Sequence, residues 1–402
     1  MPDRQEEYSR LWQADGPLTL PALPPLALYV HIPWCVRKCP YCDFNSHQLD
    51  PQADAGAQQA RYVDALLADL QAGLPLIWGR PVISVFLGGG TPSLFEPMQI
   101  ERLIAGIRAL LPLRPGCEIT MEANPGTFER ERFAAFAAAG ITRLSVGVQS
   151  FDDAALKRLG RVHDAEQARA ALTEAARVFA TFNLDLMYAL PGQTLELLQA
   201  DLQEALSFNP PHLSIYQLTL EPGTVFAKYP PPLPPDDVAW AMLDAITAGT
   251  AQAGLQRYEV SAYARAGHNC LHNVNYWQFG DYLGIGAGAH GKLSFAHRVV
   301  RQVRYRVPES YMRHALAGGA ISEQHEVAPA DLPFEYMLGA LRLKDGFSLD
   351  DFTARTGLPL QTVEAQIYEA TRNGWLQREG QWVQPTARGF DFLNDVQALF
   401  LP

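Results

Sequence analysis

Six strand-like apolar segments alternate with segments of helical period, and this alternation limits the possible folds more than any other feature of the chain. Within residues 63–70 and 100–107, apolar side chains recur at i, i+3, i+4 and i+7, as on one face of a helix. Strands that alternate with helices predict a parallel sheet covered by helices. The strand-like segments read LALYVHI (26–32), VISVFLG (82–88), EITMEAN (118–124), RLSVGVQ (143–149), NLDLMYA (183–189) and HLSIYQL (212–218).

Polar residues at the ends of these segments favour a barrel over a doubly wound sheet. A cysteine-rich stretch follows the first segment, GGGTPS (88–93) follows the second and LPGQ (190–193) follows the fifth. Functional groups gathered at the carboxyl ends of many strands are typical of the mouth of a TIM-type barrel. We therefore predict an α/β fold built on an incomplete, splayed TIM-like (β/α)6 barrel.

The rest of the chain divides into further regions. We expect an N-terminal extension at 1–25, the partial barrel at 26–227 and a middle region at 228–326 that extends the barrel and begins with the proline-rich run KYPPPLPPDD (228–237). From 327 to 402, short helices precede GWLQREGQWVQPTARGFDFLNDV (374–396), which indicates a winged-helix-like α+β domain. Residues 331–402 carry six basic and ten acidic side chains, a net charge of 6 − 10 = −4. A wing that reads DNA is basic, so we expect no nucleic-acid partner.

The charge and hydropathy of the whole chain favour a cytoplasmic protein. The net charge of −11 argues against a large basic face. The opening segment MPDRQEEYSRLWQADG is polar, unlike a secretory signal, and no apolar run reaches the roughly 20 residues that span a bilayer. We expect no transmembrane segment, and a peripheral contact with a membrane stays open.

Three of the five cysteines form a C-x3-C-x2-C cluster at Cys35, Cys39 and Cys42. In a reducing compartment this cluster indicates a metal or redox site, and we interpret the isolated Cys117 and Cys270 as buried thiols. Three thiolates would leave one iron of a four-iron cluster open for chemistry. A zinc site completed by His31 or His47 is the alternative reading of the same spacing.

The cysteine motif after YVHIP (29–33), together with GGGTP (88–92), resembles the radical S-adenosylmethionine (SAM) superfamily. The resemblance implies that the three cysteines hold a 4Fe–4S cluster, whose open iron binds the amino and carboxylate groups of SAM. Further motifs are MEANPG (121–126), GVQSF (147–151), LGRVH (159–163) and NLDLMYALPGQ (183–193). The residues that the resemblance implies for the SAM pocket are Tyr29, Tyr41, Gly90, Thr91, Glu122, Gln149, Arg161 and Asp185.

Within the superfamily, the chain resembles the branch of anaerobic coproporphyrinogen III oxidases and heme chaperones, from about Tyr29 to the C-terminal wing. The oxidases carry a further cysteine two positions after the third, where this chain has Phe44, and a longer segment before the cluster. HNVNYW (272–277) instead matches the H-N-x-x-Y-W motif of the heme chaperones. These differences favour a chaperone over an oxidase.

The HNVNYW motif is a candidate heme surface. His272 offers an axial nitrogen, and the rings of Tyr276 and Trp277 offer a flat apolar wall. Alternatively, the two aromatic residues belong to the core and His272 caps a helix, with His268 and Cys270 as other candidate ligands.

The nearby GAGAHG (286–291) fits a dinucleotide fingerprint, but a strand-like segment follows it where a helix is required. We interpret its glycines as allowing the loop to lie close to the cluster or the heme. The resulting expectation is a cytoplasmic chaperone with a 4Fe–4S cluster and SAM, which delivers heme to an acceptor such as a respiratory hemoprotein. Oxygen-independent coproporphyrinogen III oxidation, a radical decarboxylation to protoporphyrinogen IX, is the alternative.

Overall fold

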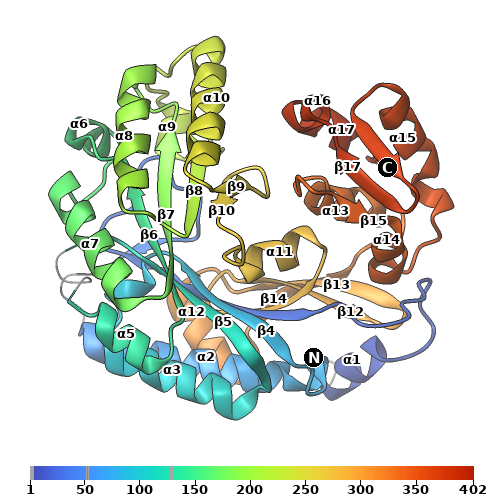
Figure 1. Cartoon of the computed structure of the whole chain (residues 1–402). Helices are drawn as coiled ribbons and strands as arrows, with labels where there is room; N and C mark the ends of the chain where they lie inside the picture. The colour runs from blue at the N-terminus through green and yellow to red at the C-terminus, as the bar shows by residue number, and fades with distance from the viewer. Residues whose placement is uncertain (1–3, 51, 53, 127–130) are drawn as a thin grey trace.

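The computed structural model describes residues 4–50, 52, 54–126 and 131–402, so residues 1–3 of the predicted N-terminal extension lie outside the described part. All six predicted strands are present and pair in parallel, in the order of the sequence. They curve into an open partial barrel (Figure 1). The strands are β1 (Leu26–Ile32), β4 (Val82–Gly89), β5 (Leu113–Ala123), β6 (Arg143–Gln149), β7 (Thr181–Tyr188) and β8 (His212–Gln217).

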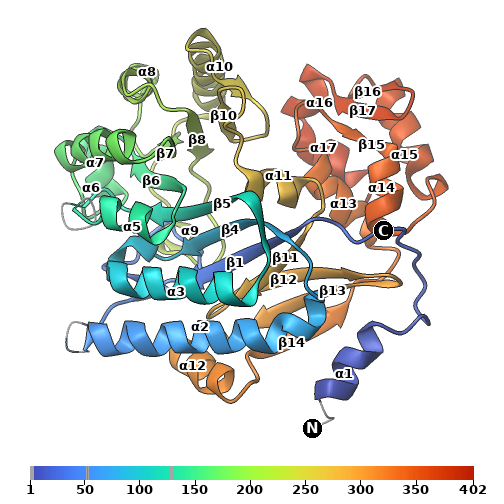
Figure 2. The same cartoon turned by 60° about the horizontal axis from the view of Figure 1, so that its bottom comes forward.

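Helices connect these strands and cover the outer face of the sheet, as Figure 2 shows for α2 and α3. The predicted helical periods are confirmed: Val63, Leu66 and Leu70 of α2 are fully buried, as are Ile100 and Leu103 of α3. The helices that follow the strands are α2 (Ala55–Ile77), α3 (Pro97–Leu110), α5 (Phe133–Ala139), α6 (Asp153–Arg158), α7 (Ala165–Val178) and α8 (Leu195–Ser207).

Later segments extend the sheet at both edges. Strand β11 (Asp281–Ile285) pairs in parallel with β1, and the antiparallel strands β12 (His290–Phe295), β13 (Arg298–Arg304) and β14 (Ile321–Glu326) follow it outward. At the other edge, β10 (Ala262–Ala264) pairs with β8 and with β9 (Gln256–Arg257). Tyr258 N donates to Ala262 O and closes a tight turn between β9 and β10. The helices of this region are α9 (Val225–Lys228), α10 (Asp236–Gln252), α11 (Leu271–Trp277) and α12 (Pro308–Leu316).

The C-terminal region forms a separate hydrophobic core beside α11, coloured red in Figure 1. A three-stranded antiparallel sheet in the order β15-β17-β16 packs with helices, which is a winged-helix-like arrangement. Leu18 and Leu20 of the N-terminal extension join this core. The elements are α13 (Leu332–Ala340), β15 (Phe347–Ser348), α14 (Leu349–Thr356), α15 (Gln361–Arg372), β16 (Leu376–Glu379), β17 (Trp382–Pro385), α16 (Ala387–Asp391) and α17 (Leu393–Ala398).

Three short elements complete the description. Helix α1 (Arg4–Leu11) precedes the extended segment that reaches β1, and the two-residue strands β2 (Trp34–Cys35) and β3 (His47–Gln48) bracket the cysteine-rich loop. Across the described ranges, no helix has both the length and the apolar character needed to cross a membrane.

Candidate active site and ligand cavities

A cavity of about 480 Å³ opens at the carboxyl ends of the parallel strands. We call it the first cavity. The ends of parallel strands meet at one edge of the sheet, so residues from five strand ends converge there. The predicted residues that line it are Cys35, Cys39, Tyr41, Cys42, Gly90, Thr91, Glu122, Gln149, Arg161, Asp185 and His272.

The cysteine-rich loop presents three free thiols to the first cavity. Each sulfur has one polar side-chain neighbour: Thr91 Oγ1 lies 3.5 Å from Cys35 Sγ, a guanidinium nitrogen of Arg161 lies 3.9 Å from Cys39 Sγ, and Ser46 Oγ lies 3.8 Å from Cys42 Sγ. The guanidinium favours negative charge on the loop, as a set of thiolate ligands requires.

The glycine motif after β4 forms hydrogen bonds with the end of β1 and with β2, beside the cysteine-rich loop. Gly90 N donates to Ile32 O at 2.7 Å, and Thr91 N donates to Trp34 O at 2.8 Å. A Cβ atom on Gly90 would lie 2.6 Å from Trp34 O, so only glycine permits this approach of two backbone segments. The motif therefore has a packing role beside any contact with a ligand.

The two histidines considered for zinc are engaged elsewhere. His31 Nδ1 lies 2.8 Å from Tyr29 Oη and His31 Nε2 lies 3.0 Å from Asn45 O, while His47 Nε2 lies 3.3 Å from Asn45 Oδ1. In the described part of the chain, no three His, Cys, Asp or Glu side chains are grouped so as to hold a single metal ion. A zinc site completed by either histidine would first have to break that histidine's contacts.

Two carboxyl groups, Glu122 and Asp185, form part of the wall of the first cavity. Burial, together with the nearby charge of Asp185, raises the pKa of Glu122 to about 7. Burial also raises the pKa of Asp185 to about 6, although hydrogen bonds from Asn183 and Ser145 oppose the shift. A cation in the cavity would stabilise both carboxylates, and SAM carries a positive charge on its sulfonium sulfur. The wall therefore fits SAM.

Arg161 and Asn124 join the thiol side of the cavity to the strand ends. Arg161 Nη2 donates to Asn124 Oδ1 at 2.6 Å, and Asn124 Nδ2 donates to Thr91 Oγ1 at 2.8 Å. Asn124 is a cavity residue that the motif comparison omits, although its position at the end of the third predicted strand could have indicated it.

Gln149 reaches the first cavity through an unusual backbone. Its φ is +69°, and the pairing of β6 with β7 shifts register between Gly147 and Gln149. Bulges of this kind re-aim a side chain at functional sites. The sequence pattern of alternating residues does not reveal this local change.

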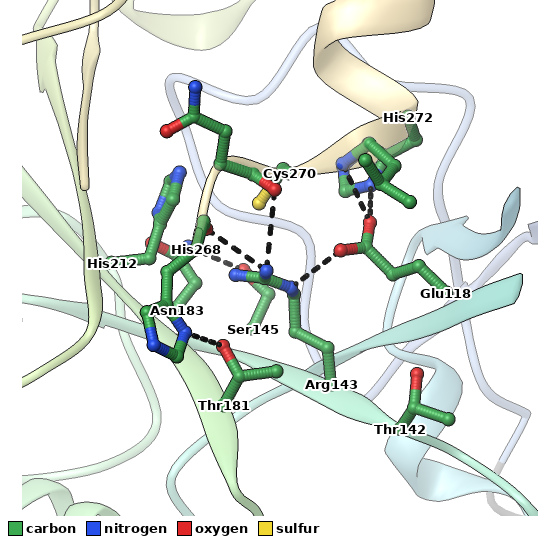
Figure 3. Close-up of polar contacts among 12 residues, drawn as sticks. Glu118, Thr142, Arg143, Ser145, Thr181, Asn183, His212, His268, Cys270 and His272 are labelled. Atoms are coloured by element: carbon green, nitrogen blue, oxygen red, sulfur yellow. Dashed lines mark hydrogen bonds and ion pairs between the residues drawn. The ribbon is translucent and has the colours of Figure 1, made fainter. Parts of the chain in front are cut away.

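His272 lies in a buried hydrogen-bond network where α11 meets the barrel (Figure 3). Its Nδ1 lies 3.1 Å from Glu118 Oε1, and the same oxygen accepts a 3.0 Å hydrogen bond from Leu271 N. Glu118 Oε2 accepts from Arg143 Nε at 2.9 Å, and Arg143 also donates to His268 O at 3.0 Å. Burial opposes ionisation of Glu118, but the hydrogen bond from His272 and the charge of Arg143 lower its pKa overall.

The other proposed ligands near the motif have structural contacts. His268 Nδ1 lies 3.1 Å from Thr181 Oγ1. Cys270 is buried at the first cavity, and burial raises the pKa of its thiol to about 12. Cys117, by contrast, is only partly buried.

Tyr29, Tyr276 and Trp277 do not line the first cavity. They line a second cavity of about 580 Å³, between the β11–β13 edge of the sheet and α13. The predicted SAM and heme residues are thus divided between two cavities. Asp43, Phe44 and Phe86 line both, so the cavities are neighbours.

The loop of GAGAHG lies against the cysteine-bearing segment, as expected. Asn45 Nδ2 donates to Ala287 O at 2.9 Å, and a Cβ atom on Gly288 would lie 2.4 Å from that same nitrogen. The strand β12 that begins within the motif confirms the rejection of a dinucleotide site.

Comparisons with known proteins agree with the site. Residues 29–205 match the radical SAM superfamily, and residues 327–392 match the HemN C-terminal domain. The chain is 46% identical over 381 residues to the heme chaperone HemW of Escherichia coli (strain K12), covering 94% of this chain and 99% of that protein. It is also 46% identical over 388 residues to the heme chaperone HemW of Haemophilus influenzae, covering 95% and 99%.

A solved structure supports the fold. Coproporphyrinogen III oxidase (HemN) from Escherichia coli, described as a radical SAM enzyme, superposes with a TM-score of 0.78 at 24% identity, over 94% of this chain and 90% of that one.

Proposed function

The chain belongs to the HemW family of the radical SAM superfamily, and we propose that it is a chaperone that binds heme and delivers it to hemoproteins. The observation that carries the proposal is the position of α11. This helix holds HNVNYW at the boundary of the two cavities, with His272 on the first and Tyr276 and Trp277 on the second. An aromatic wall beside a second cavity suits a flat macrocycle.

The first cavity would hold a 4Fe–4S cluster on Cys35, Cys39 and Cys42, and SAM on the surrounding polar residues. When bound, the cluster supplies electron-transfer chemistry at its open iron. Glu122 and Asp185 would neutralise the positive charge of SAM, while Arg161 would stabilise the thiolates and help to hold Asn124 in place. Tyr41, Gly90, Thr91 and Gln149 would contribute the remaining walls.

The proposed setting is the cytoplasm, with a respiratory-chain hemoprotein as the acceptor and with peripheral contact to a membrane during delivery. The acidic C-terminal wing, with its net charge of −4, suits a protein partner better than nucleic acid.

Phe44 favours the carrier over the oxidase. Its side chain is 56% exposed at the border of both cavities, in the position where the oxidases have a further cysteine. An apolar ring there supplies contact area for a ligand but no thiol.

The test is anaerobic reconstitution of the protein with iron and sulfide, followed by titration with hemin and a separate assay with coproporphyrinogen III. The proposal expects stoichiometric heme binding, read by a shifted Soret band, and no decarboxylated product. Absence of heme binding together with turnover of coproporphyrinogen III would establish the oxidase instead.

A further inference from the structure

Resting on the proposed function, we infer that heme binds in the second cavity, with Arg306 pairing with a propionate and His290 facing the iron. This assignment differs from the sequence-based one, in which His272 offers the axial nitrogen. It depends on three properties of the cavity: its aromatic lining, an arginine whose side chain has no partner among the described residues, and a histidine of which the same is true.

Aromatic side chains make up much of the lining of the second cavity. A porphyrin is flat and apolar over both faces, so aromatic faces and edges are suitable contacts for it. The side chains come from β1, the cysteine-rich loop, β4, α11 with the segment after it, and β11. They are Tyr29, Phe44, Phe86, Tyr276, Trp277, Phe279 and Tyr282.

Three cations line the cavity, and two of them already have partners. Lys292 is buried, with Nζ 3.0 Å from Asp281 Oδ1. Arg301 donates to Glu335 Oε2 at 2.6 Å and to Tyr282 Oη at 2.9 Å. Both are neutralised within the fold and have little to offer a ligand.

Arg306 is different. Its side chain is exposed and makes no ion pair or hydrogen bond within the described ranges, while its backbone oxygen accepts a 2.8 Å hydrogen bond from Asn45 Nδ2. The backbone is thus held at the cavity while the guanidinium stays available. A guanidinium binds a carboxylate through two parallel hydrogen bonds, which matches a heme propionate.

The histidines at the two cavities likewise divide into those whose side chains have partners and one whose side chain has none among the described residues. Both nitrogens of His31 are occupied, by Tyr29 Oη and Asn45 O. His272 lines the other cavity, with Nδ1 on Glu118 and its ring stacked on Phe86 at 4.3 Å. His290 is exposed and lines the second cavity, and its side chain makes no hydrogen bond in the part of the chain that the structure describes. Between the two histidines that line this cavity, His290 is the one whose imidazole an iron could take without breaking an existing contact.

The test compares hemin with its dimethyl ester, which lacks free carboxylates, on the cluster-loaded protein. Wild type, Arg306→Glu and the control Arg388→Glu are titrated with both. Arg388 is exposed and lines neither cavity, so the control makes the same charge change elsewhere. We expect Arg306→Glu to bind hemin about tenfold more weakly or worse, since a hydrogen bond to a charged group is lost. It should bind the ester as wild type does, and Arg388→Glu should bind both as wild type does.

Ligation is tested by the spectrum of bound heme in His290→Ala and His272→Ala. The expected result is a shifted Soret maximum in His290→Ala and an unshifted maximum in His272→Ala, whose bound heme keeps its ligand even where loss of the Glu118 contact lowers the amount bound. Equal hemin affinity of Arg306→Glu and wild type, equal wild-type affinity for hemin and ester, or a change confined to His272→Ala would overturn the assignment. Failure of wild type to bind hemin at all would instead overturn the proposed function.

Discussion

The imidazole of His272 and the carboxylate of Glu118 lie 3.1 Å apart and join α11 to the barrel, across 154 positions of the sequence. Glu118 also accepts hydrogen bonds from Leu271 N and Arg143 Nε, so three donors share one buried carboxylate. His272 is 6% exposed. The hydrogen bond thus fixes the helix that lines both cavities, with His272 on the first cavity and Tyr276 and Trp277 on the second.

Replacing Glu118 with alanine should strongly destabilise the fold. The change leaves buried Arg143 without its carboxylate and removes the acceptor for Leu271 N, and breaking such a pair costs about 3–5 kcal/mol. Urea denaturation measures the free energy of unfolding, with Glu101→Ala as control because Glu101 is exposed on α3. Similar losses in both variants would contradict the structural role of the network.

Removing the cluster ligands should abolish iron and sulfide retention. We expect the alanine variants of Cys35, Cys39 and Cys42 each to lose the cluster after anaerobic reconstitution, since no other cysteine of the loop can replace the missing thiolate. Cys117→Ala is the matched control, because Cys117 lies outside both cavities. Iron and sulfide per chain are the readout, and full retention in the three loop variants would refute the ligand assignment.

The stability of the protein without cofactors should fall as the pH rises from about 4.5 to 7. Burial raises the pKa of Glu122 from 4.5 to about 7, so the folded state holds this proton over a range in which the unfolded state has released it. The contribution is present below pH 4.5 and lost above pH 7. Glu122→Gln should therefore be more stable than wild type at pH 8, by about 1–3 kcal/mol. Thermal denaturation at pH 5 and pH 8 measures the difference. Equal stabilities of Glu122→Gln and wild type at pH 8 would contradict the raised pKa of Glu122.

Binding of SAM to the cluster-loaded protein should tighten between pH 6 and pH 8. The positively charged ligand favours the ionised forms of Glu122 and Asp185, whose pKa values lie near 7 and 6. Anaerobic calorimetry measures the affinity. Glu122→Gln should bind more weakly at pH 8 and show less dependence on pH. An affinity that does not change with pH in wild type would remove the two carboxyls from the SAM pocket.

The sequence predicted the barrel because six strand-like apolar segments alternate with segments of helical period. It also brought the polar strand ends to one cavity, since parallel strands place their carboxyl ends at a common edge. The sequence motifs assigned Tyr29 to the SAM pocket as well, whereas the structure places it in the second cavity. The surroundings of Tyr29 depend on β11, where Gly284 pairs with Tyr29 from 255 positions away (284 − 29), and on α13 beyond it.

Glu118 illustrates the same limit. It lies at an ordinary position of a strand-like segment, and only long-range contacts with α11 and Arg143 give it a role. The second cavity is likewise built from segments that no local pattern joins, which is why Arg306 and His290 carry no signal in the sequence.

The central claim, that heme is carried and handed over, is tested most directly by the kinetics of transfer. The heme-loaded protein is mixed with a heme-free b-type cytochrome, and the rate of heme appearance in the acceptor is followed by absorbance at several acceptor concentrations. Direct handover predicts a rate that rises with acceptor concentration, because a complex of the two proteins must form. A rate that stays at the value for spontaneous heme dissociation, whatever the acceptor concentration, would contradict the chaperone function.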